Sequence, residues 1–213
     1  CWEGLEAQRR SRQKEKQATD LARQLAEVRL ASLRLQLQPH FLFNTLNAIS
    51  SMVRDQPQIA EEMIANLGDL LRSSLELEKE PMVPLSKELQ LLDRYLAIEQ
   101  TRFGDRLSVM RQIDEAALES LVPTLFLQPL AENAIRHGIE PKPGPGLFRL
   151  EAALVEGRLH LRISDDGLGF DTAREGAGIG LSNTKARLEE IYGTGSRFRV
   201  APGLKDGTVV KLD

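Results

Sequence analysis

The chain has 213 residues, a formal net charge of -3, 41% hydrophobic and 28% charged residues, so we expect a folded core of ordinary size. No apolar run approaches the roughly 20 residues of a membrane-spanning helix, and the charge balance gives no reason to expect a nucleic-acid partner. Its one cysteine, Cys1, leaves no disulfide framework or thiolate metal cluster in this chain. Because the chain opens on Cys1 without a signal-peptide pattern, we expect it to be a piece of a longer protein.

The first segment, residues 3–38, is rich in Arg, Gln, Glu, Lys and Ala and carries one apolar stripe. The stripe steps by 3, 4, 3, 4 and 3 residues, which is the spacing of a coiled-coil seam: Ala18, Leu21, Leu25, Val28, Ser32 and Leu35. The stripe covers few heptads and includes a serine, so it fits either a solvated single helix or a short parallel coiled coil. We assign residues 1–33 to a coiled-coil signalling helix.

The next stretch, LQLQPHFLFNTLNAISSM over residues 35–52, predicts an amphipathic helix interrupted by a Pro-His pair. An apolar stripe steps by 4, 3 and 4 residues: Leu42, Leu46, Ile49 and Val53. A polar stripe with the same steps lies two residues out of phase: His40, Asn44, Asn47 and Ser51. Two residues are roughly 200° around a helix, so the stripes occupy opposite faces and we expect His40 to point to solvent.

The Pro-His pair suits a chemical role. Pro39 lacks an amide hydrogen, so the carbonyl of Leu35 loses its partner and we expect the helix to bend beside His40. Neutral imidazole keeps a lone pair at pH 7, which makes it a nucleophile as well as an acid–base group, and Asn44 one turn on can orient the ring. Taken alone, the pair also fits an ordinary kinked, solvated helix. No Cys, Asp or Glu stands at ligand spacing around His40, which argues against a zinc site.

Two further amphipathic segments precede residue 104. The first runs over residues 59–77 after a break at Pro57, and Pro81 and Pro84 interrupt it. We expect Ser86 to cap the second, which carries Leu89, Leu92, Leu96 and Phe103. These helices are expected to form an antiparallel hairpin that finds further apolar partners, most simply in a dimeric bundle.

From residue 104 onward strand patterns appear, and this half predicts an α+β fold. LFRLEAAL (147–154) and RLHLRIS (158–164) alternate apolar and polar residues around the turn VEG, which indicates a hairpin. RFRVAPG and GTVVKL predict two more strands. Helices are expected over residues 123–137 and 180–192.

The motif PLAENAIRHG carries three polar side chains with helical spacing. Asn133, Arg136 and His137 fall at i, i+3 and i+4, and in an α-helix they would share one face. Asn offers a neutral oxygen to a magnesium ion, and Arg and His offer charge or donors to phosphate oxygens. The motif is therefore consistent with a nucleotide site, although Asn133 could also serve only in capping or packing.

Two glycine-rich motifs follow, ISDDGLGF and GAGIGLSN. In the first, Asp165 ends a strand before Gly167 and Gly169, where a carboxylate can accept from an adenine amino group and the glycines let backbone approach a flat base. The second motif leads into a helix that begins near Leu181, and its glycines are Gly176, Gly178 and Gly180. The first backbone amides of such a helix form a natural phosphate cradle. Each motif alone fits an ordinary turn, but the ordered set favours nucleotide binding.

These motifs resemble the N, G1 and G2 boxes of the GHKL ATP-binding fold, and GTVVKL at Gly207 resembles its closing Gly-Thr element. With QLQPHFLFNTLN, PLSKELQLLDRYLAIEQTRFGDRL and LVPTLFLQPLAENA, the chain resembles the LytS-type sensor histidine kinase family from about residue 34 to its end. The resemblance implies an α+β chain: a coiled coil and a helical hairpin in a dimeric bundle, then a GHKL (Bergerat) α/β sandwich. The implied domains are 34–103, for dimerisation and histidine phosphotransfer, and 104–213, for catalytic ATP binding.

The resemblance also implies roles for individual residues. His40 would be the phosphoryl acceptor with Asn44 beside it, and Asn133 would be the magnesium ligand. Asp165 would read adenine. The remaining implied ATP-binding residues are Arg136, His137, Gly167, Gly169, Gly178, Gly180 and Thr208. The lid between Gly169 and Gly178 is short, and we expect Arg174 within it to be a solvated surface residue.

Two positions depart from related families. In the more common histidine kinases an acidic residue follows the acceptor, whereas here Phe41 follows and Asn44 cannot take a proton, so the general base is unidentified. In the ATP-hydrolysing relatives a glutamate sits four residues before the asparagine, whereas here that position is Pro129. This argues against a gyrase-like hydrolase. Glu132 is adjacent to Asn133 but points roughly 100° away on a helix, and its role is open.

The family resemblance implies ATP-dependent autophosphorylation on His40 with Mg²⁺, then transfer to an aspartate of a response regulator receiver domain. One alternative is a degenerate nucleotide-binding dimerisation module that transfers no phosphate. Another is an anti-sigma-type kinase that phosphorylates a partner's serine without using His40. The implied partners are a second copy of the chain and the receiver domain, with no nucleic acid directly. The piece is expected to be the cytoplasmic portion of a membrane-anchored sensor whose sensor region precedes it.

Overall fold

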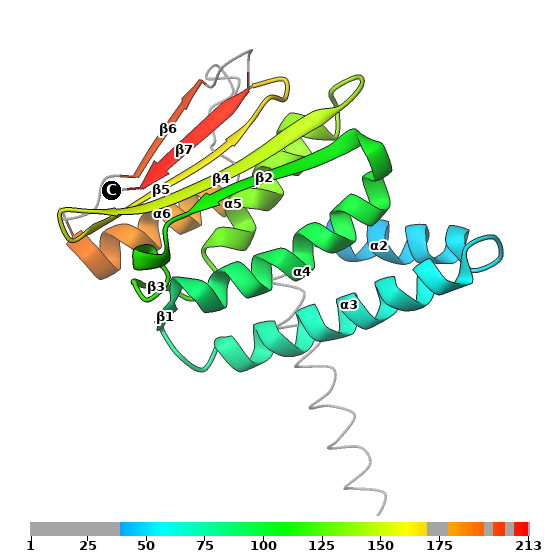
Figure 1. Cartoon of the computed structure of the whole chain (residues 1–213), viewed down its shortest axis with the longest axis horizontal. Coiled ribbons are helices and arrows are strands. Elements are labelled where there is room, and N and C mark those ends of the chain that lie inside the picture. The colour runs from blue at the N-terminus through cyan, green and yellow to red at the C-terminus, as the bar shows by residue number, and fades with distance from the viewer. Residues whose placement is uncertain (1–38, 170–178, 194–197, 203–206, 213) are drawn as a thin grey trace, which may run out of the picture. The chain divides into compact units, whose positions relative to one another are not determined.

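The structure is a computed structural model that describes residues 39–169, 179–193, 198–202 and 207–212 (Figure 1). Its contacts divide the chain into two units, Cys1–Asn47 and Ala48–Asp213, and each is described by itself. The predicted coiled-coil stripe lies outside the described residues. Among the helices that are described, none combines the length and apolar character needed to cross a membrane. The domain ranges 1–33, 34–103 and 104–213 remain predictions.

Helix α2 (Pro39–Met52) begins at Pro39, where a missing amide hydrogen costs little because the first amides of a helix have no partner. His40 is exposed, as predicted. The predicted apolar face was wrong at Leu46 and Val53, each 53% exposed, and is confirmed at Ile49, which is buried together with Phe41 and Thr45. Thr45 donates its Oγ1 hydroxyl to the carbonyl of Phe41 at 2.9 Å. The hydrogen bond within the helix allows the threonine to be buried. A search for apolar residues alone does not predict this position.

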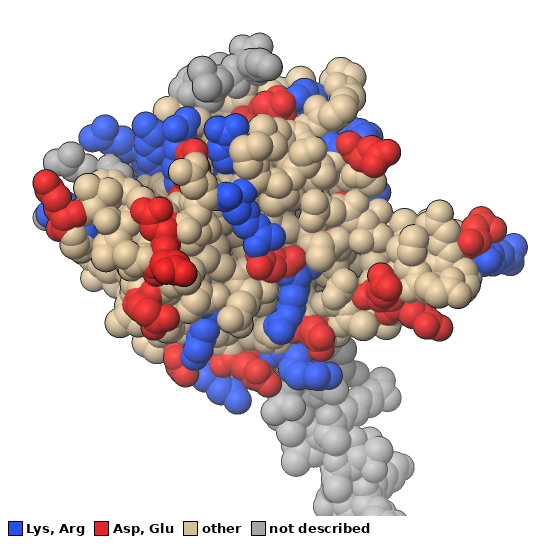
Figure 2. All heavy atoms as spheres, viewed as in Figure 1, with Lys and Arg blue, Asp and Glu red and all other residues tan. Residues whose placement is uncertain are grey.

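Helices α3 (Pro57–Leu77) and α4 (Leu85–Phe103) confirm the two predicted amphipathic segments and pack against each other. The predicted cap at Ser86 was wrong, because α4 begins at Leu85 and no side chain caps it. The amides of Leu85 and Ser86 instead donate to the carbonyls of Ser120 and Leu118, each at 2.9 Å. A neighbouring loop thus satisfies the amides that a capping side chain would have satisfied. On the surface of α3 and α4, acidic and basic side chains are interspersed (Figure 2).

The predicted helix over residues 123–137 begins later and ends differently. Pro123 belongs to a short strand β3 (Leu121–Pro123), which pairs antiparallel with β1 (Met82–Pro84). Leu125 then adopts a φ of 58°, which helical geometry excludes, so α5 covers Leu127–Asn133. The helix continues as a π-helical segment, η3 (Ala134–Ile139).

The main sheet of the described residues has the order β2-β4-β5-β7-β6, with β2 parallel to β4 and the other neighbours antiparallel. Its strands are β2 (Leu107–Ile113), β4 (Gly146–Val155), β5 (Arg158–Asp165), β6 (Phe198–Pro202) and β7 (Thr208–Leu212). Short 3₁₀ turns, η1 (Gly104–Arg106) and η2 (Glu115–Ala117), flank β2. The β4–β5 hairpin, strands β6 and β7, and helix α6 (Ile179–Tyr192) confirm their predictions, whereas β1, β2 and β3 were not predicted.

The core of the second unit lies between this sheet and the helices along one of its faces. Strand β4 alternates buried and half-buried side chains, and its buried members include Phe148 and Leu150. Leu161 and Ile163 of β5 are buried as well. Helices α4, α5 and α6 lie along the sheet (Figure 1), which confirms the α+β class. This packing brings the end of β5 against η3, where the sequence places the nucleotide motifs.

Candidate functional site

The first part of the candidate site is the exposed turn of α2 that carries His40. The Nδ2 amide of Asn44 lies 3.3 Å from Nε2 and 3.4 Å from Nδ1 of His40. An amide N–H donates to a ring nitrogen that carries no proton, so the tautomer of the ring decides which nitrogen accepts from Asn44. The predicted hydrogen bond is present, while the catalytic roles of His40 and Asn44 remain predictions.

The second part is a glycine cradle around Asp165, made by Gly138, Gly167 and Gly207. Asp165 is the last residue of β5 and is 6% exposed, and its Oδ1 accepts from the amide of Gly167 at 2.9 Å. A Cβ on Gly138 would lie 2.3 Å from Asp165 Oδ1, and one on Gly167 would lie 2.1 Å from the carbonyl carbon of Gly138. A Cβ on Gly207 would lie 1.9 Å from the carbonyl oxygen of Asp165. Only glycine allows these three backbone segments to meet here.

Gly138 is a residue of this cradle that the sequence did not single out. It ends the quoted motif PLAENAIRHG, but nothing in that motif shows that its Cα faces a glycine 29 residues later. The carbonyl of Gly138 also accepts from the amide of Leu168 at 3.1 Å. The contact therefore joins the first and second motifs through backbone alone.

The paired carboxylates Asp165 and Asp166 have different environments. Burial raises the pKa of Asp165 to about 6, against the opposing effect of the Gly167 and Thr208 amides. For Asp166, burial would also raise the pKa, but the amide of Leu147 and the ammonium of Lys142 outweigh it and lower the pKa. Asp166 accepts from that amide at 2.7 Å and pairs with Lys142 at 2.9 Å. Asp166 thus holds the start of β4, whereas Asp165 accepts from the amides of Gly167 and Thr208.

The titration of Asp165 predicts a pH dependence of nucleotide binding. The role predicted for Asp165, accepting from an adenine amino group, requires the ionised carboxylate, so affinity should fall as pH drops through about 6. At pH 5 we expect roughly 10-fold weaker binding than at pH 8. Titrating a non-hydrolysable ATP analogue at both pH values measures this. In Asp165→Asn the step should vanish, and because the phosphates titrate equally in both proteins, identical pH curves would refute the assignment.

The structure places Asn133 at the end of α5, half-buried, with Arg136 half-buried and His137 exposed. The prediction that these three share one face assumed α geometry, whereas residues 134–139 are π-helical. Fewer degrees separate successive residues in the wider helix, so the predicted common face no longer follows. π-Helical turns occur often at functional sites, and this one begins directly after Asn133.

The remaining predicted residues fall on three segments. Thr208 begins β7, is buried, and donates its backbone amide to Asp165. Gly169 has a φ of 82°, a left-handed conformation that favours glycine. Gly180 lies in the first turn of α6. Gly178, Gly176 and Arg174 lie outside the described residues.

Glu132, whose role the sequence left open, is 6% exposed. Burial raises its pKa to about 7, against the attraction of Arg136 and with the help of Glu99. Its Oε1 atom has no hydrogen-bond partner. Its neighbours include Tyr95 and Glu99 of α4, so this side chain belongs to the contact between α5 and α4.

The residues present fit a magnesium nucleotide. Within the described ranges no group of three or more His, Cys, Asp or Glu side chains could hold a metal ion by itself. Magnesium in nucleotide sites is commonly held by one or two protein oxygens together with substrate phosphates, so a single asparagine such as Asn133 is an adequate protein contribution. The three glycines of the cradle let backbone segments pack against one another at Asp165, where an added Cβ would lie 1.9–2.3 Å from protein atoms.

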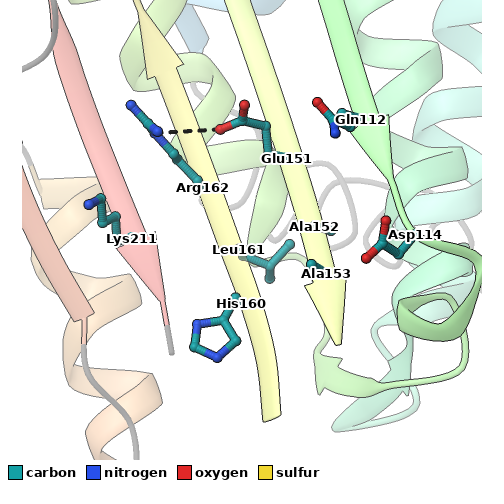
Figure 3. A pocket seen from close by; sticks show the side chains of 9 residues that line it. All are labelled: Gln112, Asp114, Glu151, Ala152, Ala153, His160, Leu161, Arg162 and Lys211. Carbon is teal, nitrogen blue, oxygen red and sulfur yellow. Dashed lines mark ion pairs between the residues drawn. The ribbon is translucent and has the colours of Figure 1, made fainter. Parts of the chain in front are cut away.

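Two hollows in the described part of the chain lie apart from Asn133. The larger, of about 390 Å³, is lined by side chains of β2, β4, β5 and β7 and by Asp114 (Figure 3). Glu151 and Arg162 form an ion pair within it at 3.5 Å. None of the predicted nucleotide residues lines it. The smaller, of about 200 Å³, is bordered by both Asp165 and Asp166.

The sheet, the helices on one face and the glycine cradle define a GHKL nucleotide-binding fold. The histidine kinase domain of a blue-light activated histidine kinase from Erythrobacter litoralis matches with a TM-score of 0.51. That match covers 92% of this chain and 94% of that domain at 22% identity. A solved structure described as a bacterial phosphotransferase also has a TM-score of 0.51, covering 88% of this chain and 95% of that one at 11% identity.

Sequence comparisons specify the family. The sequence profile described as "Histidine kinase" matches residues 28–107. Sensor histidine kinase YpdA of Escherichia coli K12 is 40% identical over 196 residues, which are 87% of this chain and 34% of the relative. Sensor protein LytS of Oceanobacillus iheyensis is 31% identical over 198 residues, 86% of this chain and 34% of the relative. The chain belongs to the LytS-type sensor histidine kinase family, and it spans about a third of the length of these relatives.

Proposed function

We propose that this chain is the kinase core of a two-component sensor, which phosphorylates itself on His40 from ATP and passes the phosphoryl group to a response regulator. The observation that carries the proposal is the presence, in one chain, of an exposed imidazole oriented by Asn44 and a glycine cradle around Asp165. An acceptor and a nucleotide site on separate units suit a reaction gated by their approach. The domain ranges 34–103 and 104–213 belong to this proposal.

In the proposed complex, Asp165 accepts from the adenine amino group, and Gly167 and Gly169 let backbone approach the base. Asn133 would offer its amide oxygen to Mg²⁺, which would supply positive charge against that developing on the phosphates. The groups assigned to the phosphates and the pocket wall are Arg136, His137, Gly178, Gly180 and Thr208.

The proposed chemistry is an in-line displacement at the γ-phosphorus. A ring nitrogen of His40 attacks with its lone pair, a P–N bond forms, and the bond to the β,γ-bridging oxygen breaks. ADP leaves with that electron pair, and the imidazole loses its remaining ring proton to solvent. The phosphoramidate then transfers its phosphoryl group to an aspartate carboxylate of a receiver domain, which restores the free histidine.

A second copy of the chain is the proposed partner for the helices. On α3 and just before it, three apolar side chains remain well exposed: Val53 at 53%, Ile59 at 39% and Ile64 at 54%. Apolar side chains on one helical hairpin support burial in a dimeric bundle. We further propose that the chain is the cytoplasmic part of a membrane-anchored sensor. The segments that would anchor it lie outside this chain.

Incubation of the purified chain with γ-labelled ATP and Mg²⁺ tests the proposed function. We expect label on the chain that is stable in base and labile in acid, as a phosphoramidate requires. Nucleotide binding without any label would instead support a dimerisation module that transfers no phosphate. Label that appears only on the serine of an added partner would support a serine kinase.

A further inference from the structure

Helix α4 contacts both ends of the helix that carries Asn133. That helix comprises α5 and η3, Leu127–Ile139, and Asn133 stands near its middle, where α winding gives way to π winding. Both anchoring contacts come from polar side chains of α4, with help from the 3₁₀ turn η1 that follows it. None of these contacts belongs to the predicted nucleotide residues.

The N-terminal anchor is Glu88, which is 1% exposed. Its carboxylate accepts from the amides of Leu125, Phe126 and Leu127 at 2.6, 3.1 and 3.2 Å. The amides at a helix start lack partners within the helix, and an acidic group there is also favoured by the helix dipole. Burial raises the pKa of Glu88, while these three amides oppose the rise. One side chain of α4 therefore fixes the start of α5.

The C-terminal anchor is Arg102, whose side chain is 15% exposed. Its Nη2 donates to Glu99 at 2.6 Å, and its Nη1 donates to Glu140, the first residue after η3, at 2.9 Å. Arg106 of η1 adds donations to the carbonyls of Glu140 at 3.3 Å and Lys142 at 2.9 Å. A cationic group at a helix C-terminus satisfies carbonyls that have no partner and complements the dipole.

The C-terminal anchor differs from the interspersed charges on the surface (Figure 2). Exposed ion pairs contribute little because water and salt screen them. Glu99 is 1% exposed, so its charge is tolerated only while the guanidinium of Arg102 keeps its geometry. Such a buried pair specifies position more than it adds stability. It is therefore suited to holding one helix against another.

The π turn shows why fixed ends matter for Asn133. The amide of Glu140 donates to the carbonyl of Ile135 at 2.7 Å, five residues back, rather than four as in an α-helix. A helix whose winding changes midway has more than one way to place its middle residues. Because α4 holds both ends, α4 sets the position of Asn133 around and along the axis of the helix that carries it.

We infer that Glu88 and Arg102 are positioning residues for phosphoryl transfer, acting through α5 and η3 to hold the amide of Asn133 where it meets Mg²⁺ on ATP. The inference rests on the proposed function, because it assumes that Asn133 serves a magnesium nucleotide. Because α3 packs on α4 and α4 packs on α5, the inference predicts that a movement of the α3–α4 hairpin would shift Asn133. The helices that precede the nucleotide fold thereby gain a direct mechanical connection to its magnesium site.

The test compares Glu88→Gln and Arg102→Lys with a control on the same helix. Asp93→Asn breaks an ion pair that joins α4 to Arg111 of β2, and neither partner belongs to α5 or η3. The dissociation constant of a non-hydrolysable ATP analogue is measured with Mg²⁺ and with EDTA. We expect the Mg²⁺ value to rise about 10-fold in both anchor variants and the EDTA value to change less than about 3-fold. The control should change neither value by more than about 2-fold.

The outcomes separate positioning from simple support of the fold. Equal losses with Mg²⁺ and with EDTA, alongside a lower melting temperature, would overturn the inference, and so would unchanged affinities. If Arg102→Lys does not fold, Glu140→Gln replaces it, because the Glu140 carboxylate is 31% exposed and its loss leaves the Arg102–Glu99 pair in place. That variant should raise the Mg²⁺ value about 3-fold. If the unaltered chain shows no Mg²⁺-dependent binding, the proposed function itself fails, and the inference fails with it.

Discussion

The substitution His40→Gln should abolish phosphate incorporation from ATP while nucleotide affinity stays unchanged. Glutamine has no ring nitrogen with a free lone pair, so no P–N bond can form, and we expect a loss of at least about 10³-fold. His40 is exposed on α2, so the replacement should disturb folding little. Label per mole of chain and the dissociation constant for ATP measure the two effects.

A second histidine of the chain supplies the control for this result. The chain has three, and His160 lies on β5, among the side chains that line the larger hollow (Figure 3). His160→Gln should therefore keep full labelling. Acid-labile label that persists in His40→Gln and disappears in His160→Gln would assign the acceptor to the sheet. It would leave α2 without its proposed role.

Periodicity predicted the long elements well because each carries its own pattern. The β4–β5 hairpin alternates over ten and eight residues, and its turn residues Glu156 and Gly157 both have positive φ, as a tight hairpin requires. Strands β1 and β3 have three residues each and end in proline, so they are too short to show a recognisable alternation. Their pairing lies beside the loop before β3, whose carbonyls accept from the first amides of α4.

The residues of the site also differ in whether a local motif or a distant contact identifies them. Asp165 and Gly167 could be found because they share the motif ISDDGLGF, and Asn133 because it stands in the motif PLAENAIRHG. Gly138 could not, since its importance depends on a contact with Gly167 across two motifs. Glu88 also could not, because it satisfies amides that lie 37 to 39 residues further along the chain. Such partners are set by packing of whole elements and leave no trace in local spacing.

The substitution Gly167→Ala should disable the nucleotide site from within its backbone. The new Cβ would lie 2.1 Å from the carbonyl carbon and 2.3 Å from the Cα of Gly138, where ordinary contacts are 3.4–4 Å. Neither atom belongs to a side chain that can rotate away, so the end of β5 and the end of η3 must separate. We expect the free energy of unfolding to fall by about 1–3 kcal/mol and nucleotide affinity by roughly 10- to 100-fold.

Helix α3 offers a glycine that isolates the effect of the contact from the effect of the added methyl group. A Cβ on Gly68 would meet nothing within 4 Å, so Gly68→Ala should leave nucleotide affinity unchanged and raise the free energy of unfolding by about 0.5–1 kcal/mol. Chemical denaturation and nucleotide titration on both variants make the comparison. If Gly167→Ala bound nucleotide within about 3-fold of the unaltered chain, the close approach of Gly138 and Gly167 would not shape the nucleotide site. The joining of the two motifs at Asp165 would then be a feature of folding alone.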